Sequence, residues 1–200
     1  MSRSPLEIVF VCTANRFRSP LAEGFLRASA QGLPVNVRSY GTVQIEGEPA
    51  LREAINLASR YGVDISEHRS RSLSRARLEE VDLVVGFEWI HVAEAVVEAG
   101  AKRDRAFTLL ELIRALAAIE LERGGNPLRH AREAIRGADQ NRSMHPGMEI
   151  HDPVGGQKRG YTRVGEQVHD LIAELAVHLL PATSRAVPGT APRRGSSRAP

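Results

Sequence analysis

Cysteine is almost absent from this chain, because Cys12 is the only one in 200 residues. A single cysteine cannot form a disulfide within the chain, so the fold must be stabilised without one. One unpaired thiol is compatible with a reducing compartment, and we expect the protein to be cytoplasmic. The scarcity also excludes any reaction that relays oxidation through several cysteines of the same chain.

Features that direct a chain to membranes or to nucleic acids are also missing. No apolar run approaches the ~20 residues that span a bilayer, and the first residues lack the apolar segment of a signal peptide. The formal net charge of +3 arises in residues 183–200, which hold four arginines and no acidic residue. Without those four, 23 of the 27 basic residues remain against 24 acidic ones. We therefore predict neither a membrane nor a nucleic-acid partner.

Apolar runs alternate with segments of helical spacing along most of the chain. The apolar runs expected to form buried strands are 6–11, 35–40, 81–87 and 106–109. Helical spacing predicts helices at 19–30, 49–61, 90–99 and 162–180. Strands that alternate with helices indicate the α/β class and a parallel sheet. We predict a three-layer sandwich in which helices flank a four-stranded parallel sheet.

Residues 111–147 depart from this alternation. Apolar residues repeat at helical spacing from Leu112 to Ile119, a break follows at 124–127, a second helix is expected at 128–135 and a loop at 137–147. We interpret 111–147 as a lengthened helical and loop segment inserted in a single domain that spans residues 1–182. Residues 183–200 are rich in Pro, Ser, Gly, Ala and Arg, which predicts a disordered basic tail.

The first predicted strand runs into the segment Val11-Cys12-Thr13-Ala14-Asn15-Arg16-Phe17-Arg18-Ser19-Pro20. A junction from strand to helix presents free backbone N–H groups and the positive end of the helix dipole, and both attract anions. The same features favour the thiolate form of Cys12, which is the nucleophilic form. The planar guanidinium of Arg18 matches the geometry of a phosphate-like oxyanion. The segment therefore predicts a nucleophile beside an anion cradle.

This segment resembles the phosphate-binding loop of the low molecular weight protein tyrosine phosphatases, which carry Cys-x5-Arg-Ser-Pro near the amino terminus. Further similarities follow in the family's order at 39–42, at 64–71 and at the pair Asp152-Pro153. The resemblance implies a phosphatase domain with its phosphate-binding loop after the first strand, and no metal or other cofactor. It also implies that Cys12 attacks phosphorus, that Arg18 holds the phosphoryl oxygens and that Asp152 acts as general acid and then as general base.

The resemblance assigns further residues to the site. The amides of residues 13–18 would hold phosphoryl oxygens, and Ser19 would donate a hydrogen bond to the thiolate. The positions of Asn15, Ser19, Ser39 and His68 match a hydrogen-bond network that lies behind the loop in this family. The expected substrate-binding residues are Thr13, Ala14, Asn15, Arg16, Phe17 and Ser19, with Ser39 and His68 as supporting residues.

The resulting prediction is a cysteine-dependent phosphatase of phosphotyrosine proteins or small aryl phosphates, acting as a monomer or weak dimer. Two alternatives remain open. Arsenate reductases share this fold and loop, and a chain with one cysteine would have to use an external small-molecule thiol. A module that binds oxyanions without catalysis is the second alternative, although the joint presence of Cys12, Arg18 and Asp152 argues against it.

Overall fold

A four-stranded parallel sheet forms the centre of the computed structural model. The structure describes residues 4–120, 125–142, 147–153, 155 and 158–180, so the tail predicted at 183–200 lies outside the described residues. The strands are β1 (Leu6–Cys12), β2 (Val35–Gly41), β3 (Leu83–Gly86) and β4 (Ala106–Thr108). Their order is β2-β1-β3-β4 and every pair is parallel. The predicted α/β class is confirmed.

The central strand β1 is buried on both faces, as its apolar run predicts. Ile8 and Phe10 pack into the larger of two apolar clusters, whereas Val9 and Val11 point to the smaller one on the opposite face. All four side chains are at most 2% exposed. This alternation fixes the register of β1, because a slip by one residue would exchange the two faces.

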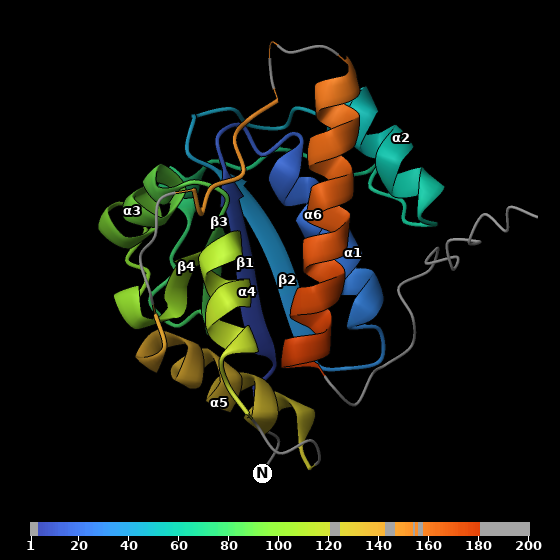
Figure 1. The fold of residues 1–200 in the computed structure, drawn as a ribbon. Helices are drawn as coiled ribbons and strands as arrows, with labels where there is room; N and C mark the ends of the chain where they lie inside the picture. Colours follow the sequence, from blue (N-terminus) through green and yellow to red (C-terminus); the bar gives the residue numbers. More distant parts are fainter. Residues whose placement is uncertain (1–3, 121–124, 143–146, 154, 156–157, 181–200) are drawn as a thin grey trace, which may run out of the picture.

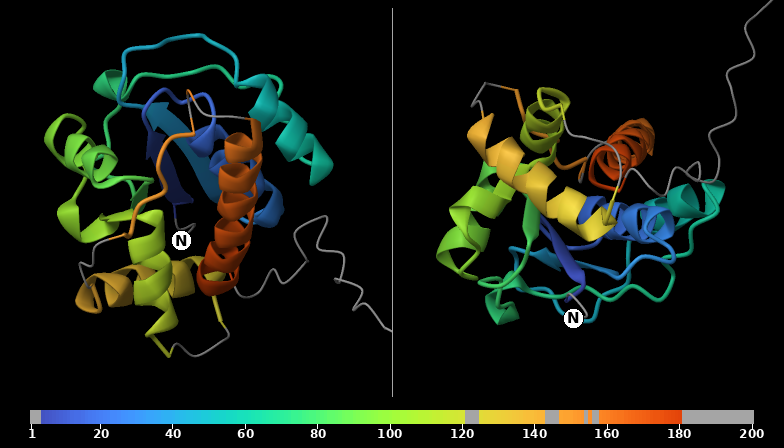
Figure 2. Two further views of the ribbon diagram at one scale, coloured as in Figure 1. Left: turned by 45° about the horizontal axis from the view of Figure 1, so that its top comes forward. Right: turned by 90° about the horizontal axis from the view of Figure 1, so that it is seen from below.

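Helices cover both faces and complete the three layers. They are α1 (Arg18–Ser29), α2 (Arg52–Arg60), α3 (Trp89–Val97), α4 (Leu109–Ala117), α5 (Pro127–Gln140) and α6 (Lys158–Leu179), with short 3-10 turns η1 (Leu73–Arg75) and η2 (Arg103–Arg105). Residues of α1, α4 and α6 share the larger apolar cluster, and α3 contributes to the smaller one. Figure 1 shows α4 and α6 in front of the strands, and Figure 2 shows the layers from two further directions. Within the described ranges, no helix has the length and apolar character needed to cross a membrane.

Helix α5 corrects one expectation from the sequence. A loop was expected to begin at Gly137, but α5 continues to Gln140. Gly137 faces Ile119, and a Cβ atom there would lie 2.9 Å from the Ile119 Cδ1 atom. The glycine therefore permits Ile119 to pack closely against α5, and it does not end the helix. Ala138, one residue later, is fully buried, which explains why the helix remains stable past the glycine.

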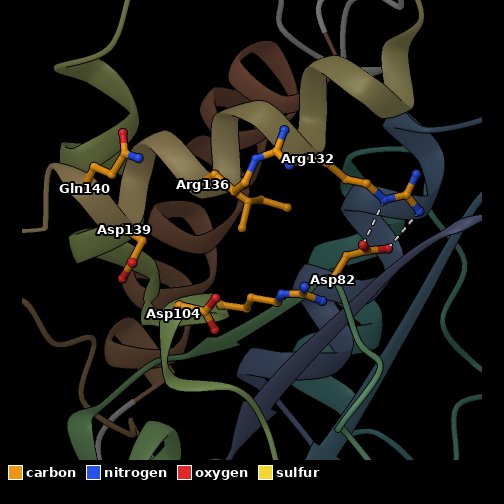
Figure 3. Close-up of a pocket in the computed structure, with 8 residues that line it drawn as sticks. Asp82, Asp104, Arg132, Arg136, Asp139 and Gln140 are labelled. Atoms are coloured by element: carbon orange, nitrogen blue, oxygen red, sulfur yellow. Dashed lines mark hydrogen bonds and ion pairs between the residues drawn. The ribbon is translucent and has the colours of Figure 1, made fainter.

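Two contacts at the amino ends of the strands hold α5 in place. Arg132 donates to both carboxylate oxygens of Asp82, from Nε at 2.9 Å and from Nη2 at 3.1 Å. The same Nη2 reaches the carbonyl oxygens of Ser4 and Pro5. Figure 3 shows this ion pair at one end of a pocket that also contains Arg136 and Asp104. Cys12 lies at the opposite, carboxyl end of β1, so α5 supports the fold at a distance from it.

Replacing Arg132 should therefore change stability and leave the chemistry intact. Arg132→Leu should lower the free energy of unfolding by about 1–3 kcal/mol, because the carboxylate of Asp82 would remain largely buried without its cation. Arg129→Leu is the matched control, since its one ion pair within the described residues is exposed, at 3.8 Å from Glu133, and it should cost less than about 1 kcal/mol. Urea unfolding measures both variants. Equal losses would show that Arg132 does not anchor α5.

Candidate functional site

Cys12 ends the central strand and lies where the predicted loop begins. It pairs in register with Gly41 of β2 and is 2% exposed. The loop then turns back over β2, and a Cβ atom at position 41 would lie 2.9 Å from backbone atoms of Thr13, Ala14 and Asn15. Only glycine therefore fits beneath the loop. The carboxyl ends of neighbouring parallel strands form the usual position of ligand sites in α/β folds.

The sulfur atom of Cys12 lies 3.0 Å from the hydroxyl of Ser19, which belongs to the first turn of α1. A thiolate can only accept hydrogen bonds, so the Ser19 hydroxyl donates to it in the ionised form. Asn15 donates from Nδ2 to the same Ser19 oxygen at 2.9 Å. The hydroxyl is thereby held in one orientation, with its hydrogen available to the sulfur.

Asn15 adopts the left-handed backbone conformation, with φ of 53°, and it is fully buried. Besides Ser19, its Nδ2 donates to Ser39 Oγ at 2.7 Å, and its Oδ1 accepts from the backbone N–H of Arg71 at 2.9 Å. All the hydrogens of its side-chain amide are used. Among non-glycine residues of the described segments only Asn15 has positive φ, and asparagine tolerates this conformation better than most.

Glu23, which is buried, and His68, which is half-buried, support this network from the far side of the loop. Glu23 of α1 accepts from the hydroxyl of Ser39 and from the Arg71 guanidinium at 3.0 Å. His68 donates from Nε2 to the backbone oxygen of Asn15 at 2.8 Å, since a carbonyl can only accept. Burial lowers the pKa of His68, so its neutral form is favoured at neutral pH. The structure thus brings the two predicted supporting residues, Ser39 and His68, to the same loop residue.

Arg18 begins α1, and its side chain is 1% exposed. Its Nη1 donates to Glu88 Oε2 and to the Ile150 carbonyl oxygen, both at 2.7 Å. Its Nη2 donates to Thr13 Oγ1 at 2.9 Å and to Asp152 Oδ2 at 2.5 Å. A buried cation requires this degree of pairing, because desolvation otherwise costs several kcal/mol.

The predicted acid, Asp152, lies on the segment between α5 and α6. Two hydrogen bonds to the backbone of residues just before Asp152 hold this segment in place. Ile150 donates its N–H to the Phe87 carbonyl oxygen at 2.8 Å, and Thr108 donates its hydroxyl to the Met148 carbonyl oxygen at 2.8 Å. The Asp152 side chain is 27% exposed, so it reaches both Arg18 and solvent. A cleft of about 390 Å³ between this segment and α6 contains Asp152 and Pro153.

Two polar residues at the start of α3 were missed by the sequence analysis. Glu88 caps α3 and binds Arg18, and His91 accepts the Glu88 N–H at Nδ1 at 3.0 Å. Burial raises the pKa of Glu88, but hydrogen bonds from Arg18 and His151 outweigh burial and leave it below its ordinary value. Burial, and next the charge of Arg18, lowers the pKa of His91 to about 4. The sequence did contain a signal for Glu88. It follows β3, and the carboxyl end of β3 lies beside that of β1 because the two strands pair in parallel.

The remaining predicted residues surround the same loop in different ways. Phe17 is 3% exposed and its ring meets Tyr161 edge-on at 5.1 Å, so only its backbone is available to a ligand. Arg16 donates from Nε to the Pro49 carbonyl oxygen at 3.0 Å, with its guanidinium 3.7 Å from Glu48. No three histidine, cysteine or acidic side chains of the described ranges are arranged to hold a metal ion.

The sequence and the fold are similar to those of known phosphatases. A family model for low molecular weight phosphotyrosine protein phosphatase matches residues 7–137. The probable low molecular weight protein-tyrosine-phosphatase EpsP of Ralstonia nicotianae is 34% identical over 105 residues, 52% of this chain and 71% of that protein. A protein-arginine-phosphatase of Bacillus subtilis is 34% identical over 110 residues, 54% of this chain and 73% of that protein. A crystal structure of a low molecular weight protein tyrosine phosphatase from T. tengcongensis has a TM-score of 0.61 and 28% identity, covering 85% of this chain and 97% of that chain.

Two variants of Asn15 separate its side-chain role from its backbone role. Asn15→Gly and Asn15→Ala should both lower the free energy of unfolding by about 2–4 kcal/mol, because buried partners lose their hydrogen bonds. Asn15→Ala should be the less stable of the two by about 1 kcal/mol, since alanine resists positive φ. Urea unfolding gives both values.

The exposed Asn36 of β2 provides the control pair. It has no positive φ, so Asn36→Gly should be less stable than Asn36→Ala, the ordinary order in a strand. The same order at position 15 would show that the left-handed conformation does not constrain the loop.

Proposed function

The chain belongs to the low molecular weight phosphotyrosine protein phosphatase family, and we propose that it hydrolyses phosphate monoesters of phenols, with phosphotyrosine in proteins as its substrate class. The reaction proceeds through a phosphate group bound covalently to Cys12. One observation carries this proposal. Cys12, Arg18 and Asp152 meet at the carboxyl end of β1, although Arg18 and Asp152 are 134 residues apart in the sequence.

In the first step the Cys12 thiolate attacks phosphorus, and the bond to the phenolic oxygen breaks. The departing oxygen takes a proton from the carboxylic acid of Asp152, so the phenol leaves as a neutral molecule. Backbone N–H groups of the loop and Arg18 hold the three equatorial oxygens, where the transition state carries its charge. The Ser19 hydroxyl stabilises the thiolate until the sulfur–phosphorus bond forms.

In the second step a water molecule attacks the phosphocysteine. The Asp152 carboxylate now accepts the proton of that water, the sulfur–phosphorus bond breaks, and inorganic phosphate and the Cys12 thiolate are released. One carboxyl group thus acts as acid and then as base, and the cycle ends in the state in which it began. Side chains and water carry out the nucleophilic attacks and the proton transfers, and neither step changes an oxidation state.

The hydrogen bonds of Arg18 imply that the phosphate of the substrate replaces the carboxylate of Asp152 on the guanidinium when substrate binds. All four Nη hydrogens donate to protein acceptors, and Nε–H alone has no partner within the described part of the chain. A bidentate grip on a phosphate needs two parallel N–H groups along one edge of the guanidinium. The edge of Nε and Nη2 provides them once Asp152 gives up Nη2. Asp152 then lies beside the incoming ester, where a proton donor is required.

The surroundings of the loop favour a phenol over arginine as the leaving group. Val43 and Ile90 are 45% and 56% exposed. The Val43 N–H donates to the Thr13 carbonyl oxygen at 2.9 Å, and Ile90 precedes His91, which contacts the Thr13 hydroxyl. Exposed apolar groups suit an aromatic ring. Arg16 adds a cation on the loop itself, which would repel the guanidinium released from phosphoarginine but can stack on a phenol ring.

Cys12→Ser tests the nucleophile. It should lower the hydrolysis of para-nitrophenyl phosphate at least about a thousandfold, while inorganic phosphate still binds because the amides and Arg18 remain. Turnover within tenfold of the wild type would remove Cys12 from this role. Phosphate binding without turnover in the wild type would identify a non-catalytic module, and reduction of arsenate with a small thiol but no ester hydrolysis would identify a reductase.

The substrate class is tested with one peptide sequence that carries phosphotyrosine, phosphoarginine or phosphoserine. We expect kcat/KM for phosphotyrosine to exceed that for phosphoarginine by about tenfold or more. Arg16→Gln should reduce this ratio, whereas Arg38→Gln, exposed on β2, should leave it unchanged. Faster hydrolysis of phosphoarginine by the wild type would reverse the assignment.

Asp152→Asn tests the acid and the anion exchange together. The rate should fall by about 10²–10⁴ with basic leaving groups and much less with acidic ones. Inorganic phosphate should bind several times more tightly, since its competitor for Arg18 is gone. Glu149→Gln is the control, because Glu149 lies on the same segment but accepts from the Trp89 backbone. An unchanged dependence on leaving-group basicity would assign the acid elsewhere.

A further inference from the structure

The side-chain hydroxyl of Thr13 has a role that the loop motif does not describe. Thr13 follows the nucleophile directly, and its amide is one of those expected to hold phosphate. Its Oγ1 atom contacts Arg18 Nη2 at 2.9 Å and His91 Nε2 at 3.1 Å. The loop, the Arg18 guanidinium and the start of α3 therefore meet at this one oxygen.

The ring of His91 has a defined hydrogen position. The backbone N–H of Glu88 donates to Nδ1 at 3.0 Å, so Nδ1 carries a lone pair. The neutral ring then has its hydrogen on Nε2, which faces Thr13. His91 is 1% exposed, and burial lowers its pKa to about 4. The nearby charged groups that act on this pKa are Arg18, Glu88 and Asp152. His91 is thus a neutral hydrogen-bond donor to Thr13 at neutral pH.

Counting the hydrogen bonds of Thr13 shows what its hydroxyl can still do. A hydroxyl oxygen has two lone pairs and one hydrogen. The N–H groups of His91 and Arg18 use both lone pairs, so the hydroxyl can act only as a donor to any further partner. No side chain or backbone group of the described segments accepts this hydrogen. Both contacts fix the oxygen, and they leave the hydrogen for an acceptor outside the network.

We propose that the Thr13 hydroxyl donates a hydrogen bond to the oxyanion held by the loop, and that His91 is the positioning residue that orients it. This inference rests on the proposed function. Thr13 and Asp152 both accept hydrogen bonds from Arg18 Nη2. The Thr13 hydroxyl therefore lies beside the guanidinium nitrogen at which phosphate is proposed to replace Asp152. A donor fixed in advance by two partners stabilises transition-state charge without reorganisation.

Thr13→Val tests the hydroxyl, because valine keeps the shape and the backbone amide. We expect kcat for para-nitrophenyl phosphate to fall about tenfold to a hundredfold, with KM changed by less than about threefold, and inorganic phosphate and vanadate to bind more weakly. Thr13→Ser should restore kcat to within about threefold of the wild type. Thr42→Val is the matched control, since within the described ranges Thr42 hydrogen-bonds through its backbone N–H and not through its hydroxyl. This variant should leave kcat unchanged.

His91→Phe tests the positioning role while it retains a planar ring. It should lower kcat less than Thr13→Val does, and the double variant should have the kcat of Thr13→Val alone, because the proposal has His91 affect kcat through that hydroxyl. The second contact of His91, from the Glu88 N–H to Nδ1, caps α3, so its loss should appear in the thermal unfolding. Thermal unfolding of every variant separates loss of fold from loss of function. Additive losses in the double variant would show that His91 acts independently of Thr13 and would overturn its assignment.

Three results overturn the role of the Thr13 hydroxyl itself. Wild-type kcat and phosphate affinity in Thr13→Val would show that the hydroxyl does not contact the oxyanion. Unchanged phosphate affinity with an altered dependence on leaving-group basicity would show that the hydroxyl serves Asp152 instead. Failure of Thr13→Ser to restore kcat would assign the effect to packing. Failure of the proposed function gives a different result, because the wild type would then hydrolyse no ester. The phosphate affinities of the wild type and of Thr13→Val could still be compared in that case.

Discussion

The buried guanidinium of Arg18 is the interaction on which the rest of the site depends. A cation with 1% exposure is stable only if its charge and its hydrogens are matched by the protein. Glu88 and Asp152 supply the charge, from the end of β3 and from the segment before α6. Segments distant in the sequence must therefore meet at the carboxyl end of β1. In the proposed function, a substrate dianion replaces one of these two carboxylates on Arg18.

Different residues carry the two sides of the loop. Behind it, Asn15 holds the turn through Ser19, Ser39 and Arg71, and Glu23 closes that network. On the side that faces α3, Glu88, His91 and Thr13 orient the Arg18 guanidinium. The rear network fixes the backbone N–H groups, and the network on the α3 side fixes the side-chain donors. Both networks thus preorganise hydrogen-bond donors around the loop.

Local sequence patterns predicted the parts of the structure that local rules determine. The strand into Cys12 and the helix after it follow from apolar runs and a short motif, and the α/β fold follows from their alternation. The role expected of the Asp152-Pro153 pair came from the family resemblance. Glu88 and His91 were missed because their contacts with Arg18 and Thr13 become evident only once β3 is placed beside β1. The loop predicted to begin at Gly137 was wrong for a related reason. A glycine ends a helix or allows close packing, and only the position of Ile119 decides between them.

A crystal structure with vanadate bound to Cys12 tests the central claim about Arg18 most directly. We expect vanadate oxygens on Nε and Nη2 of Arg18, Glu88 still on Nη1, and Asp152 moved from Nη2 to the apical oxygen opposite the sulfur. An ion pair between Arg18 and Asp152 that persists beside the bound vanadate would contradict the account, because the arginine would then hold the acid and the oxyanion at once.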